Sequence, residues 1–525
     1  MRGFLIHDPL EHYAQLTPDH AALSCQGTET SYSELHSASN RLAHAMIQSG
    51  TKPQDRIGIF LHKGHELGIA IYAILKTGGA FVPLDPFMPA ERLAFIIEDC
   101  GINILVSSDA LLKTINQLPA DTSLTIAGVT GQTGFATIDQ QTISRQPATK
   151  PDVIITDQYL GYILYTSGST GNPKGMMHTH NGSICYANWG KDHVQLTSAD
   201  RVASHAPLHF DLSIFDFFST LRAGATVVLV PEPVTRFPAS WTKYIEDERI
   251  SAVFTVPYTL ITMMEQGAMD SRDLTSLRWI MFGGEPYPPG QLRQIMAALP
   301  DTNFTNVYGP AEAPSCTCYD IPRPLPDGDE PLPIGLVSLN SEGLIIDEND
   351  QACSPGQSGE LCIRSSTLTR GYWNKPELNQ RAFLFTEGPG PFPTVYFRTG
   401  DRVVTSDDGQ LRFLGRMDRM IKTRGHRVEL DEVEAALGSH NKVIEAAAFV
   451  VPDAHSSNQI IAAVEIKNGS ETDLSALFKH VKEKLPPYAV PRDLLILDAL
   501  PHTSSGKVDR RNLKNTYLQQ TQAPD

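Results

Sequence analysis

The stretch "YILYTSGSTGNPKGMMHTH", Tyr162 to His180, places a loop rich in glycine and hydroxyl residues directly after an apolar, β-prone run. Backbone N–H groups in a loop without bulky side chains can approach a ligand closely, and hydroxyls add hydrogen-bond donors, so such a loop suits phosphate oxygens. The P-loop pattern G-x-x-x-x-G-K-[ST] does not fit. Counting from Gly168, the place of the second glycine holds Pro173, and Gly175 follows Lys174. The stretch therefore predicts another kind of phosphate loop, with a flexible linker as the alternative.

On both sides of this loop, helical and strand-like patterns alternate along the chain. Residues 32–50 and 66–79 have apolar positions at helical spacing and end in glycine. Short β-prone runs separate these and later helical patterns, at residues 55–61, 80–86, 102–108, 225–230, 250–256 and 277–284. The alternation predicts an α/β fold with layered, mostly parallel sheets.

The character of the sequence changes near residue 415. The segment "GQLRFLGRMDRMIKTRGHRVEL" is dense in charge, with a solvated linker as the alternative interpretation, and a helical pattern follows it. Strand, strand and helix patterns then occupy residues 444–451, 460–466 and 474–486. We predict a large domain at 1–417, a small α+β domain at 418–525, and a hinge at Asp418.

The composition excludes several classes of protein. A net charge of −16 argues against nucleic-acid binding, because phosphate contacts need a basic surface. The seven cysteines include only one close pair, Cys316 and Cys318, so no zinc site is expected, and their odd number fits a reducing compartment. The sequence has no apolar leader and no uncharged apolar run of membrane-spanning length. We expect a cytoplasmic protein that binds neither nucleic acid nor membrane.

Four further stretches present polar side chains in loops or after strands. They are "MFGGEPYPP" from Met281, "NVYGPAEAP" with Glu312, "YFRTGDRV" with Asp401, and "PHTSSGKVDR" with Lys507. Each stretch alone is a weak signal, because Glu312 or Lys507 could be an ordinary surface residue. Their order along the chain, together with the opening loop, is the informative feature.

In this order the stretches resemble the adenylate-forming superfamily, which includes acyl-CoA synthetases, luciferases and the adenylation domains of nonribosomal peptide synthetases. The further motifs "GELCIRS", "RGYWNKPE" and "GRMDRMIKTRGHRVEL" extend the resemblance over nearly the whole chain. The stretches "HFDLSIFD" and "IKTRGHRVEL" look most like those of amino-acid-adenylating enzymes. The resemblance implies a large layered α/β domain with a small β subdomain, and a mobile α+β C-terminal domain.

The resemblance also implies a reaction and its residues. A carboxylate would attack the α-phosphate of ATP, giving an acyl-adenylate and pyrophosphate, and the acyl group would then pass to a thiol. Lys507 would bridge the two anions, and Glu312 would hold Mg²⁺. The ATP-binding residues implied in this way are Thr166, Ser167, Gly168, Ser169, Thr170, Gly171, Lys174, Gly284, Glu285, Pro286, Asn306, Tyr308, Gly309, Asp401, Arg416 and Lys507.

One position departs from the family pattern. Ala311 stands where relatives commonly have a threonine before Glu312, so a hydroxyl ligand to phosphate or metal is missing. The departure puts the rate or the metal geometry in doubt. A degenerate nucleotide-binding module is therefore an alternative, although Lys507, Glu312 and Asp401 are retained.

Asp211 opens the "DLSIFD" stretch at the position where amino-acid-adenylating relatives pair an aspartate with the substrate's α-ammonium. A helix N-cap is the alternative role of Asp211, and a carboxylic acid–CoA ligase is the alternative function. The pocket walls aligned by resemblance carry no charge, which favours a small apolar amino acid, with L-proline as the best guess. These walls are Leu212, Phe215, Thr255, Met281, Gly283, Val307, Ser315 and Cys316.

The thiol acceptor is expected to belong to a separate carrier protein with a phosphopantetheine arm, in nonribosomal peptide or related secondary-metabolite biosynthesis. No carrier-like or condensation-like segment is recognised in the sequence, so we expect a free-standing enzyme. Carrier proteins are usually acidic. A small basic patch is therefore expected around Lys422, Arg424 and Arg427. After adenylation, the small domain would rotate about Asp418 so that the segment with Gly425 faces the thiol.

Overall fold

The structure is a computed structural model of the chain, and it describes residues 3–168, 172–338, 341–388, 391–453, 457–466, 474–502 and 508–522. The chain divides into two compact units. The first unit comprises residues 1–86, 96–165 and 175–417. The second comprises residues 418–525 together with two short segments, 87–95 and 166–174. The functional hinge at Asp418 stays a prediction.

A seven-stranded sheet forms one layer of the first unit, with strand order β7-β6-β5-β3-β4-β8-β9. The pairs from β7 through to β8 are parallel, as the βαβ pattern predicts. The strands are β3 (Arg56–Phe60), β4 (Ala80–Pro83), β5 (Ile104–Ser107), β6 (Thr125–Ala127), β7 (Ala136–Ile138), β8 (Leu160–Thr166) and β9 (Lys174–Thr179).

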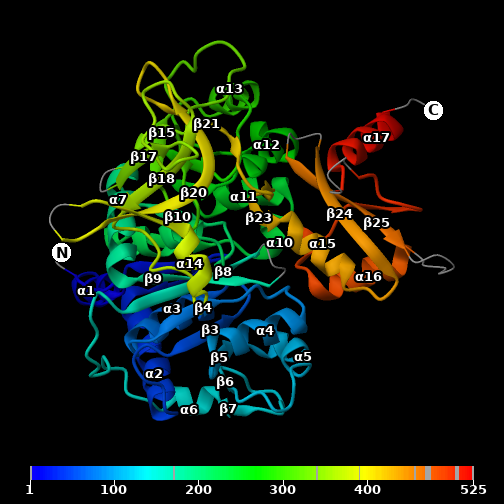
Figure 1. Cartoon of the computed structure of the whole chain (residues 1–525). Helices are drawn as coiled ribbons and strands as arrows, with labels where there is room; N and C mark the ends of the chain where they lie inside the picture. Colours follow the sequence, from blue (N-terminus) through cyan, green and yellow to red (C-terminus); the bar gives the residue numbers. More distant parts are fainter. Residues whose placement is uncertain are drawn as a thin grey trace. The chain divides into compact units, whose positions relative to one another are not determined.

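The predicted helices accompany this sheet. Helix α2 (Tyr32–Gln48) begins at a capping box of Ser31 and Glu34, and the chain leaves it through Gly50 at φ +100°. Figure 1 shows α2 and α3 in blue beside β3 and β4. The other helices are α3 (His65–Lys76), α4 (Ala90–Cys100), α5 (Leu112–Ile115) and α6 (Gln140–Ser144).

A nine-stranded sheet forms another layer of the same unit, with order β16-β15-β14-β13-β12-β10-β11-β1-β2. The strands from β1 to β14 along this order run parallel, whereas the pairs β1–β2, β14–β15 and β15–β16 are antiparallel. They are β1 (Ala21–Cys25), β2 (Thr28–Ser31), β10 (Arg201–Ser204), β11 (Thr226–Leu229), β12 (Ala252–Thr255), β13 (Trp279–Gly283), β14 (Asn303–Tyr308), β15 (Thr317–Asp320) and β16 (Leu336–Val337).

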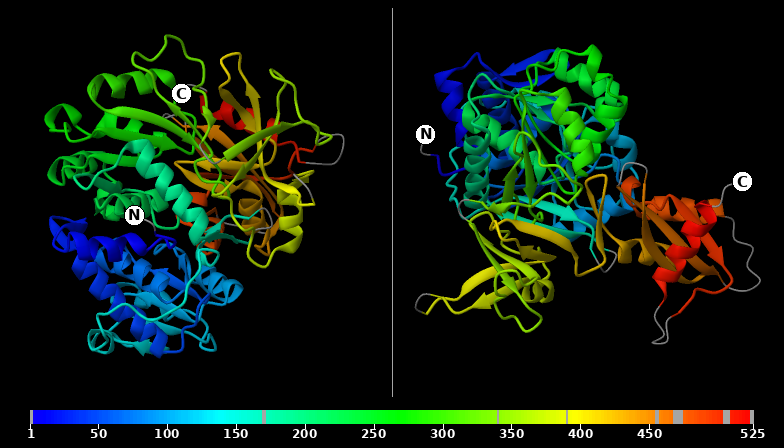
Figure 2. Two further views of the ribbon diagram at one scale, coloured as in Figure 1. Left: turned by 90° about the vertical axis from the view of Figure 1, so that its left-hand side faces the viewer. Right: turned by 90° about the horizontal axis from the view of Figure 1, so that it is seen from above.

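Alternate side chains of this sheet enter two different cores. Phe254 and Met281 belong to the main apolar cluster, whereas Val253, Ile280 and Phe282 belong to a second cluster on the opposite face. Helix α7 (His180–Val194) packs into the main cluster, which both large sheets share, and Figure 2 shows α7 running between them. The remaining helices are α1 (Asp8–Leu16), α8 (Leu212–Ile214), the π-helix η2 (Phe215–Ser219), α9 (Thr220–Ala223), α10 (Glu232–Thr235), α11 (Pro238–Asp247), α12 (Pro257–Gln266) and α13 (Pro289–Ala298).

A third, antiparallel sheet completes the first unit. Its order is β17-β18-β20-β19, with β21 paired to β20, and it corresponds to the small β subdomain expected from the family resemblance. Helix α14 precedes β19. The bounds are β17 (Ser341–Ile346), β18 (Gly359–Ser365), α14 (Pro376–Ala382), β19 (Phe383–Thr386), β20 (Thr394–Thr405) and β21 (Leu411–Arg416).

The charge-dense segment enters the second unit at Asp418, where it forms a hairpin rather than a solvated linker. Strands β22 (Met420–Thr423) and β23 (His426–Glu429) pair across a tight turn at Arg424 and Gly425, both at positive φ. A three-stranded sheet follows, with apolar clusters on both faces. Its elements are α15 (Leu430–Gly438), β24 (Val443–Pro452), β25 (Asn458–Ile466), α16 (Leu474–Lys484), β26 (Asp493–Leu497) and α17 (Arg510–Gln522). Within the described parts of the chain, no helix is long and apolar enough to cross a membrane.

Candidate active site

The predicted phosphate loop connects β8 to β9. Gly168 is required there, because a Cβ at this position would lie 2.2 Å from the carbonyl oxygen of Asn172. Ser167 Oγ donates to the carbonyl of Arg427 at 2.9 Å, and both residues belong to the second unit. Lys174 Nζ lies 3.9 Å from Glu429 Oε1 in that unit. Thr166 ends β8, whereas Ser169, Thr170 and Gly171 lie outside the described residues.

Asp401 is the centre of a polar group that the β subdomain and β14 build together. Tyr308 Oη, at the end of β14, donates to Asp401 Oδ2 at 2.5 Å. Arg416, paired with Asp401 in the β20–β21 register, donates through Nη1 to Oδ1 at 2.8 Å. Burial raises the pKa of the Tyr308 phenol well above its usual value, and the charge of Asp401 adds to this shift. Tyr308 is therefore a neutral donor, and Asp401 is held in one orientation before any ligand binds.

Glu312 is fully buried on the loop after β14. Its Oε1 accepts a hydrogen bond from Tyr372 Oη at 2.6 Å, and its backbone carbonyl accepts from the N–H of Thr369 at 2.8 Å. These contacts fix Glu312 to the segment that contains the "RGYWNKPE" motif. Tyr372 lies inside this motif, but the resemblance implies no role for it. We call Tyr308, Glu312, Tyr372, Asp401 and Arg416 the nucleotide cluster.

The remaining predicted nucleotide residues lie at the carboxyl ends of β13 and β14, which are adjacent and parallel. Gly284 follows β13 at φ +95°, where a residue with a side chain would be strained, and Glu285 and Pro286 come next. Asn306 Nδ2 donates to the carbonyl of Pro333 at 2.8 Å. A Cβ at Gly309 would lie 2.5 Å from the carbonyl oxygen of Ala313. The structure thus brings these residues and Tyr308 to one edge of the sheet.

Apolar side chains predicted as pocket walls gather beside α7. Phe215, Met281 and Val307 are buried in the main cluster, and Leu212 packs against them. Gly283 is paired with Val307, and a Cβ at position 283 would lie 2.2 Å from the carbonyl oxygen of Val307. Only glycine fits at position 283, because the backbone of the paired strand β14 occupies the space that a side chain would need.

Thr255 is not part of this group. Its hydroxyl lies 3.3 Å from His205 Nδ1, and the His205 ring packs on Trp241 of the second cluster. The preceding residue, Phe254, faces the other wall residues because side chains alternate along a strand. Its ring centroid is 6.0 Å from that of Phe215. We call Leu212, Phe215, Phe254, Met281, Gly283 and Val307 the wall cluster.

Asp211 is half-buried at the N-terminal end of α8. Its side chain makes no hydrogen bond that caps the helix, which argues against the helix N-cap as its role. Burial raises the pKa values of the Tyr162 and Tyr186 phenols, and the charge of Asp211 contributes to both shifts. The Asp211 carboxylate therefore lies near both phenols.

Tyr186 also contacts another predicted wall residue, Ser315. Ser315, at φ +51°, donates through Oγ to Tyr186 Oη at 3.5 Å. The neighbouring Cys316 thiol lies 3.6 Å from the carbonyl oxygen of Tyr308. No local pattern marks Tyr186, because it occupies an ordinary buried position of α7, and the sequence analysis missed it.

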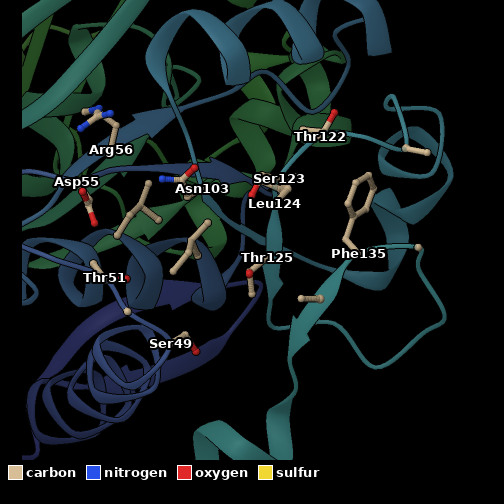
Figure 3. A pocket seen from close by; sticks show the side chains of 16 residues that line it. Ser49, Thr51, Asp55, Arg56, Asn103, Thr122, Ser123, Leu124, Thr125 and Phe135 are labelled. Atoms are coloured by element: carbon tan, nitrogen blue, oxygen red, sulfur yellow. The ribbon is translucent and has the colours of Figure 1, made fainter.

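A separate cavity of about 490 Å³ contains none of the predicted site residues. Thr51, Arg56, Asn103 and Thr125 are among its lining residues, as Figure 3 shows. These residues lie at the amino ends of β3, β5 and β6 or just before them. Ligand sites in α/β folds form at the carboxyl ends of strands, which is where Gly283, Gly284 and Tyr308 lie.

Comparison with known proteins agrees with this geometry. Residues 10–373 match the family described as "AMP-binding enzyme", and residues 432–507 match the "AMP-binding enzyme C-terminal domain". The chain belongs to the AMP-binding enzyme family. The resemblance to the adenylate-forming superfamily and the predicted fold class are thereby confirmed.

Three proteins illustrate what this chain is similar to. The L-proline--[L-prolyl-carrier protein] ligase of Pseudomonas fluorescens is 32% identical over 96% of this chain and 98% of its own length. Gramicidin S synthase 1 of Brevibacillus brevis is 31% identical over 98% of this chain, which spans only 45% of that protein. The amide bond synthetase McbA of Marinactinospora thermotolerans has the same fold, with a TM-score of 0.85, 24% identity, and coverage of 98% of this chain and 99% of McbA.

Proposed function

We propose that the protein activates a small apolar amino acid with ATP, giving aminoacyl-AMP and pyrophosphate. It then transfers the aminoacyl group to the phosphopantetheine thiol of a carrier protein. Membership of the AMP-binding family supports the adenylation step. The observation that carries the amino acid assignment is the environment of Asp211.

Asp211 is suited to bind the substrate's α-ammonium group. A half-buried carboxylate forms a favourable ion pair with a cation that the ligand brings in. The Tyr162 and Tyr186 phenols stay neutral beside it, because burial raises their pKa values. An acid without an amine would leave the carboxylate without this partner. The site therefore favours amino acids over simple carboxylic acids.

The nucleotide cluster provides the binding groups for ATP. Asp401 would accept hydrogen bonds from the ribose hydroxyls, with Arg416 keeping its carboxylate oriented. The Tyr308 ring would stack on adenine while its hydroxyl stays on Asp401. Gly284, Glu285, Pro286 and Asn306 would complete the adenine pocket. Thr166–Lys174 would bind the β- and γ-phosphates through backbone and hydroxyl donors.

The chemistry then needs a cation between two anions. A carboxylate oxygen of the amino acid attacks the α-phosphorus, the bond to the β-phosphate oxygen breaks, and pyrophosphate leaves. Lys507, which lies outside the described residues, would offset the repulsion between the carboxylate and the phosphate. In the second step the thiol sulfur attacks the carbonyl carbon. The thiol proton is lost, and AMP leaves.

Glu312 fits a magnesium ion chemically. Its carboxylate supplies the hard oxygen ligands that Mg²⁺ prefers, and the hydrogen bond from Tyr372 orients one of them. The described residues contain no group of three or more acidic, histidine or cysteine side chains that could hold a metal alone. Substrate phosphates would therefore complete the coordination, and the ion would neutralise phosphate charge.

L-Proline is the proposed substrate. The wall cluster is uncharged and almost fully buried, which supports a small apolar side chain. A full-length relative at 32% identity is named as a proline–carrier protein ligase, which supports proline in particular. Transfer to a carrier would follow rotation of the small C-terminal domain, residues 418–525, about Asp418. The hairpin residues Lys422, Arg424 and Arg427 would meet the acidic carrier.

Amino-acid-dependent ATP–pyrophosphate exchange tests this function. The panel contains the twenty amino acids and a few simple carboxylic acids, including cyclopentanecarboxylate, which has the shape of proline but no amine. We expect strong exchange with proline and little with cyclopentanecarboxylate. Exchange only with acids that lack an amine would overturn the proposal and favour a carboxylic acid–CoA ligase.

A further inference from the structure

We infer that Gly190 in α7 sets the depth of the amino acid pocket by letting the ring of Phe215 lie against the helix backbone. The inference rests on the proposed function, because it concerns the wall of that substrate site. Gly190 itself is not one of the predicted wall residues. It acts through Phe215, the one aromatic side chain among the residues predicted as walls.

The contact between α7 and η2 leaves no room for a side chain at position 190. A Cβ there would lie 2.7 Å from Phe215 Cδ2 and 3.1 Å from Phe215 Cε2. It would also lie 2.6 Å from Ser219 Oγ. Real Cβ atoms essentially never approach another heavy atom this closely, so any side chain at this position forces a neighbour to move.

Phe215 is the neighbour whose movement matters. The Ser219 hydroxyl has no hydrogen-bond partner among the described residues, so it can rotate away at little cost. Phe215 is fully buried, and its ring is held within the π-helix that begins at this residue. π-Helical turns are rare and are frequently found at functional sites. The ring can relieve the clash only by moving away from α7.

The direction away from α7 leads into the wall cluster. The Phe254 ring lies 6.0 Å from the Phe215 ring, edge to face. A Cβ at Gly283 would lie 3.8 Å from Phe254 Cε2, so Phe254 is continuous with the β13 side of the wall. Displacement of Phe215 toward Phe254 would therefore narrow the space between the π-helix and the sheet. A narrower pocket should lower kcat/KM more for larger amino acids than for smaller ones.

The test compares substrate preference in Gly190→Ala and wild-type protein. The measured quantity is kcat/KM in ATP–pyrophosphate exchange for the preferred amino acid, divided by the value for glycine. We expect this ratio to fall about tenfold in Gly190→Ala, since a change of about one methylene in an apolar pocket alters discrimination by this factor or more. Gly182→Ala is the matched control. It makes the same change in α7, and its new Cβ would contact Ser366 and Thr367 rather than a wall residue.

A second variant shows whether a loss of folding or activity in Gly190→Ala comes from the clash with Phe215. If Gly190→Ala is unstable or inactive with every substrate, the double variant Gly190→Ala, Phe215→Leu should restore folding and exchange, because it removes the ring edge that clashes. No recovery in the double variant would contradict the inference. An equal loss for all amino acids in a folded Gly190→Ala protein would also contradict it.

The proposed function can fail independently of this inference. If wild-type protein activates only acids without an amine, the amino acid assignment is wrong. The same ratio, measured between a longer and a shorter acid, then still decides whether Gly190 sets the depth of the pocket.

Discussion

The nucleotide cluster and the wall cluster belong to the same unit but are held together by different forces. In the nucleotide cluster, Asp401 and Glu312 each accept a short hydrogen bond from a tyrosine, and Arg416 adds an ion pair. In the wall cluster, Phe215, Phe254 and Met281 are fixed only by packing between the sheet and the π-helix.

This difference predicts two kinds of mutational effect. Polar partners orient the nucleotide-binding groups before a ligand arrives. Their loss should therefore lower kcat/KM by the same factor with every amino acid substrate. Apolar packing sets shape, so changes there should alter the preference between substrates. The following experiments ask whether this separation holds.

Asp401→Asn should give the largest uniform effect. The substitution removes the charge that pairs with Arg416 and weakens acceptance from the ribose. We expect kcat/KM for ATP to fall roughly 100-fold, since hydrogen bonds to charged groups contribute about 1.5–3 kcal/mol each. The measurement is pyrophosphate exchange with two amino acids of different size. Asp407→Asn, an exposed aspartate just beyond β20, is the control. A decrease in kcat/KM that differs between the two amino acids would contradict the proposed separation between the two clusters.

Tyr372→Phe should produce a smaller uniform loss. Removing the hydroxyl takes away the donor to the buried Glu312 carboxylate. We expect about a tenfold lower kcat/KM for ATP and a higher magnesium requirement, because an unsatisfied buried acceptor costs about 1–3 kcal/mol. Magnesium titration of exchange measures this, with Tyr319→Phe as the control. An unchanged magnesium requirement would mean that Tyr372 does not orient Glu312.

Features that depend on local sequence signals could be predicted without the structure. The apolar runs and glycine-terminated helices predict the parallel sheets, because periodicity and turn residues are local signals. The roles of Glu312 and Asp401 follow instead from the resemblance of the ordered motifs to the adenylate-forming superfamily. Tyr372 could have been assigned, because it lies inside a quoted motif.

Other features depend on contacts between distant segments. Gly190 and Tyr186 look like ordinary positions of α7, and only the packing of η2 against α7 distinguishes them. The resemblance implies Thr255 as a wall residue, whereas the alternation along β12 directs Phe254 toward the other wall residues. A shift of one residue along a strand reverses the side-chain direction, and a sequence pattern alone does not reveal it.

Ala311→Thr should raise activity modestly, whereas Asp401→Asn and Tyr372→Phe lower it. Ala311 is half-buried beside Glu312, and a threonine would restore the hydroxyl common in relatives. We expect exchange to become a few-fold faster, in line with about 1 kcal/mol for one added hydrogen bond. Ala311→Val has nearly the same shape without the hydroxyl and should show no gain. Equal rates for the two variants would show that the hydroxyl is not used.

The smallest effect concerns stability at low pH. His178 is buried, stacks on Tyr162 and lies within electrostatic range of Glu312 in the nucleotide cluster. Burial lowers the pKa of His178 to about 4, from 6.5 for an exposed histidine. Above pH 6.5 the residue is neutral in both states and has no effect. Below pH 6.5 only the unfolded state takes up the proton, so stability falls as the pH drops toward 4.

Urea unfolding at several pH values measures this effect. The free energy of unfolding should decrease by about 1 kcal/mol per pH unit from this residue alone between pH 6 and pH 4.5. His178→Gln removes the titrating group, so its pH dependence should be shallower by that amount. Identical slopes for the two proteins would mean that His178 does not stay neutral in the folded state.

The account depends most on Asp211, and one comparison tests that residue directly. Exchange is measured with proline and with cyclopentanecarboxylate, in the wild type and in Asp211→Asn. We expect the wild type to prefer proline, and we expect Asp211→Asn to lose roughly 100-fold or more with proline, because breaking a buried charge pair costs about 3–5 kcal/mol. The variant should change little with cyclopentanecarboxylate. Equal losses with the two acids would contradict the assignment of this site to an amino acid.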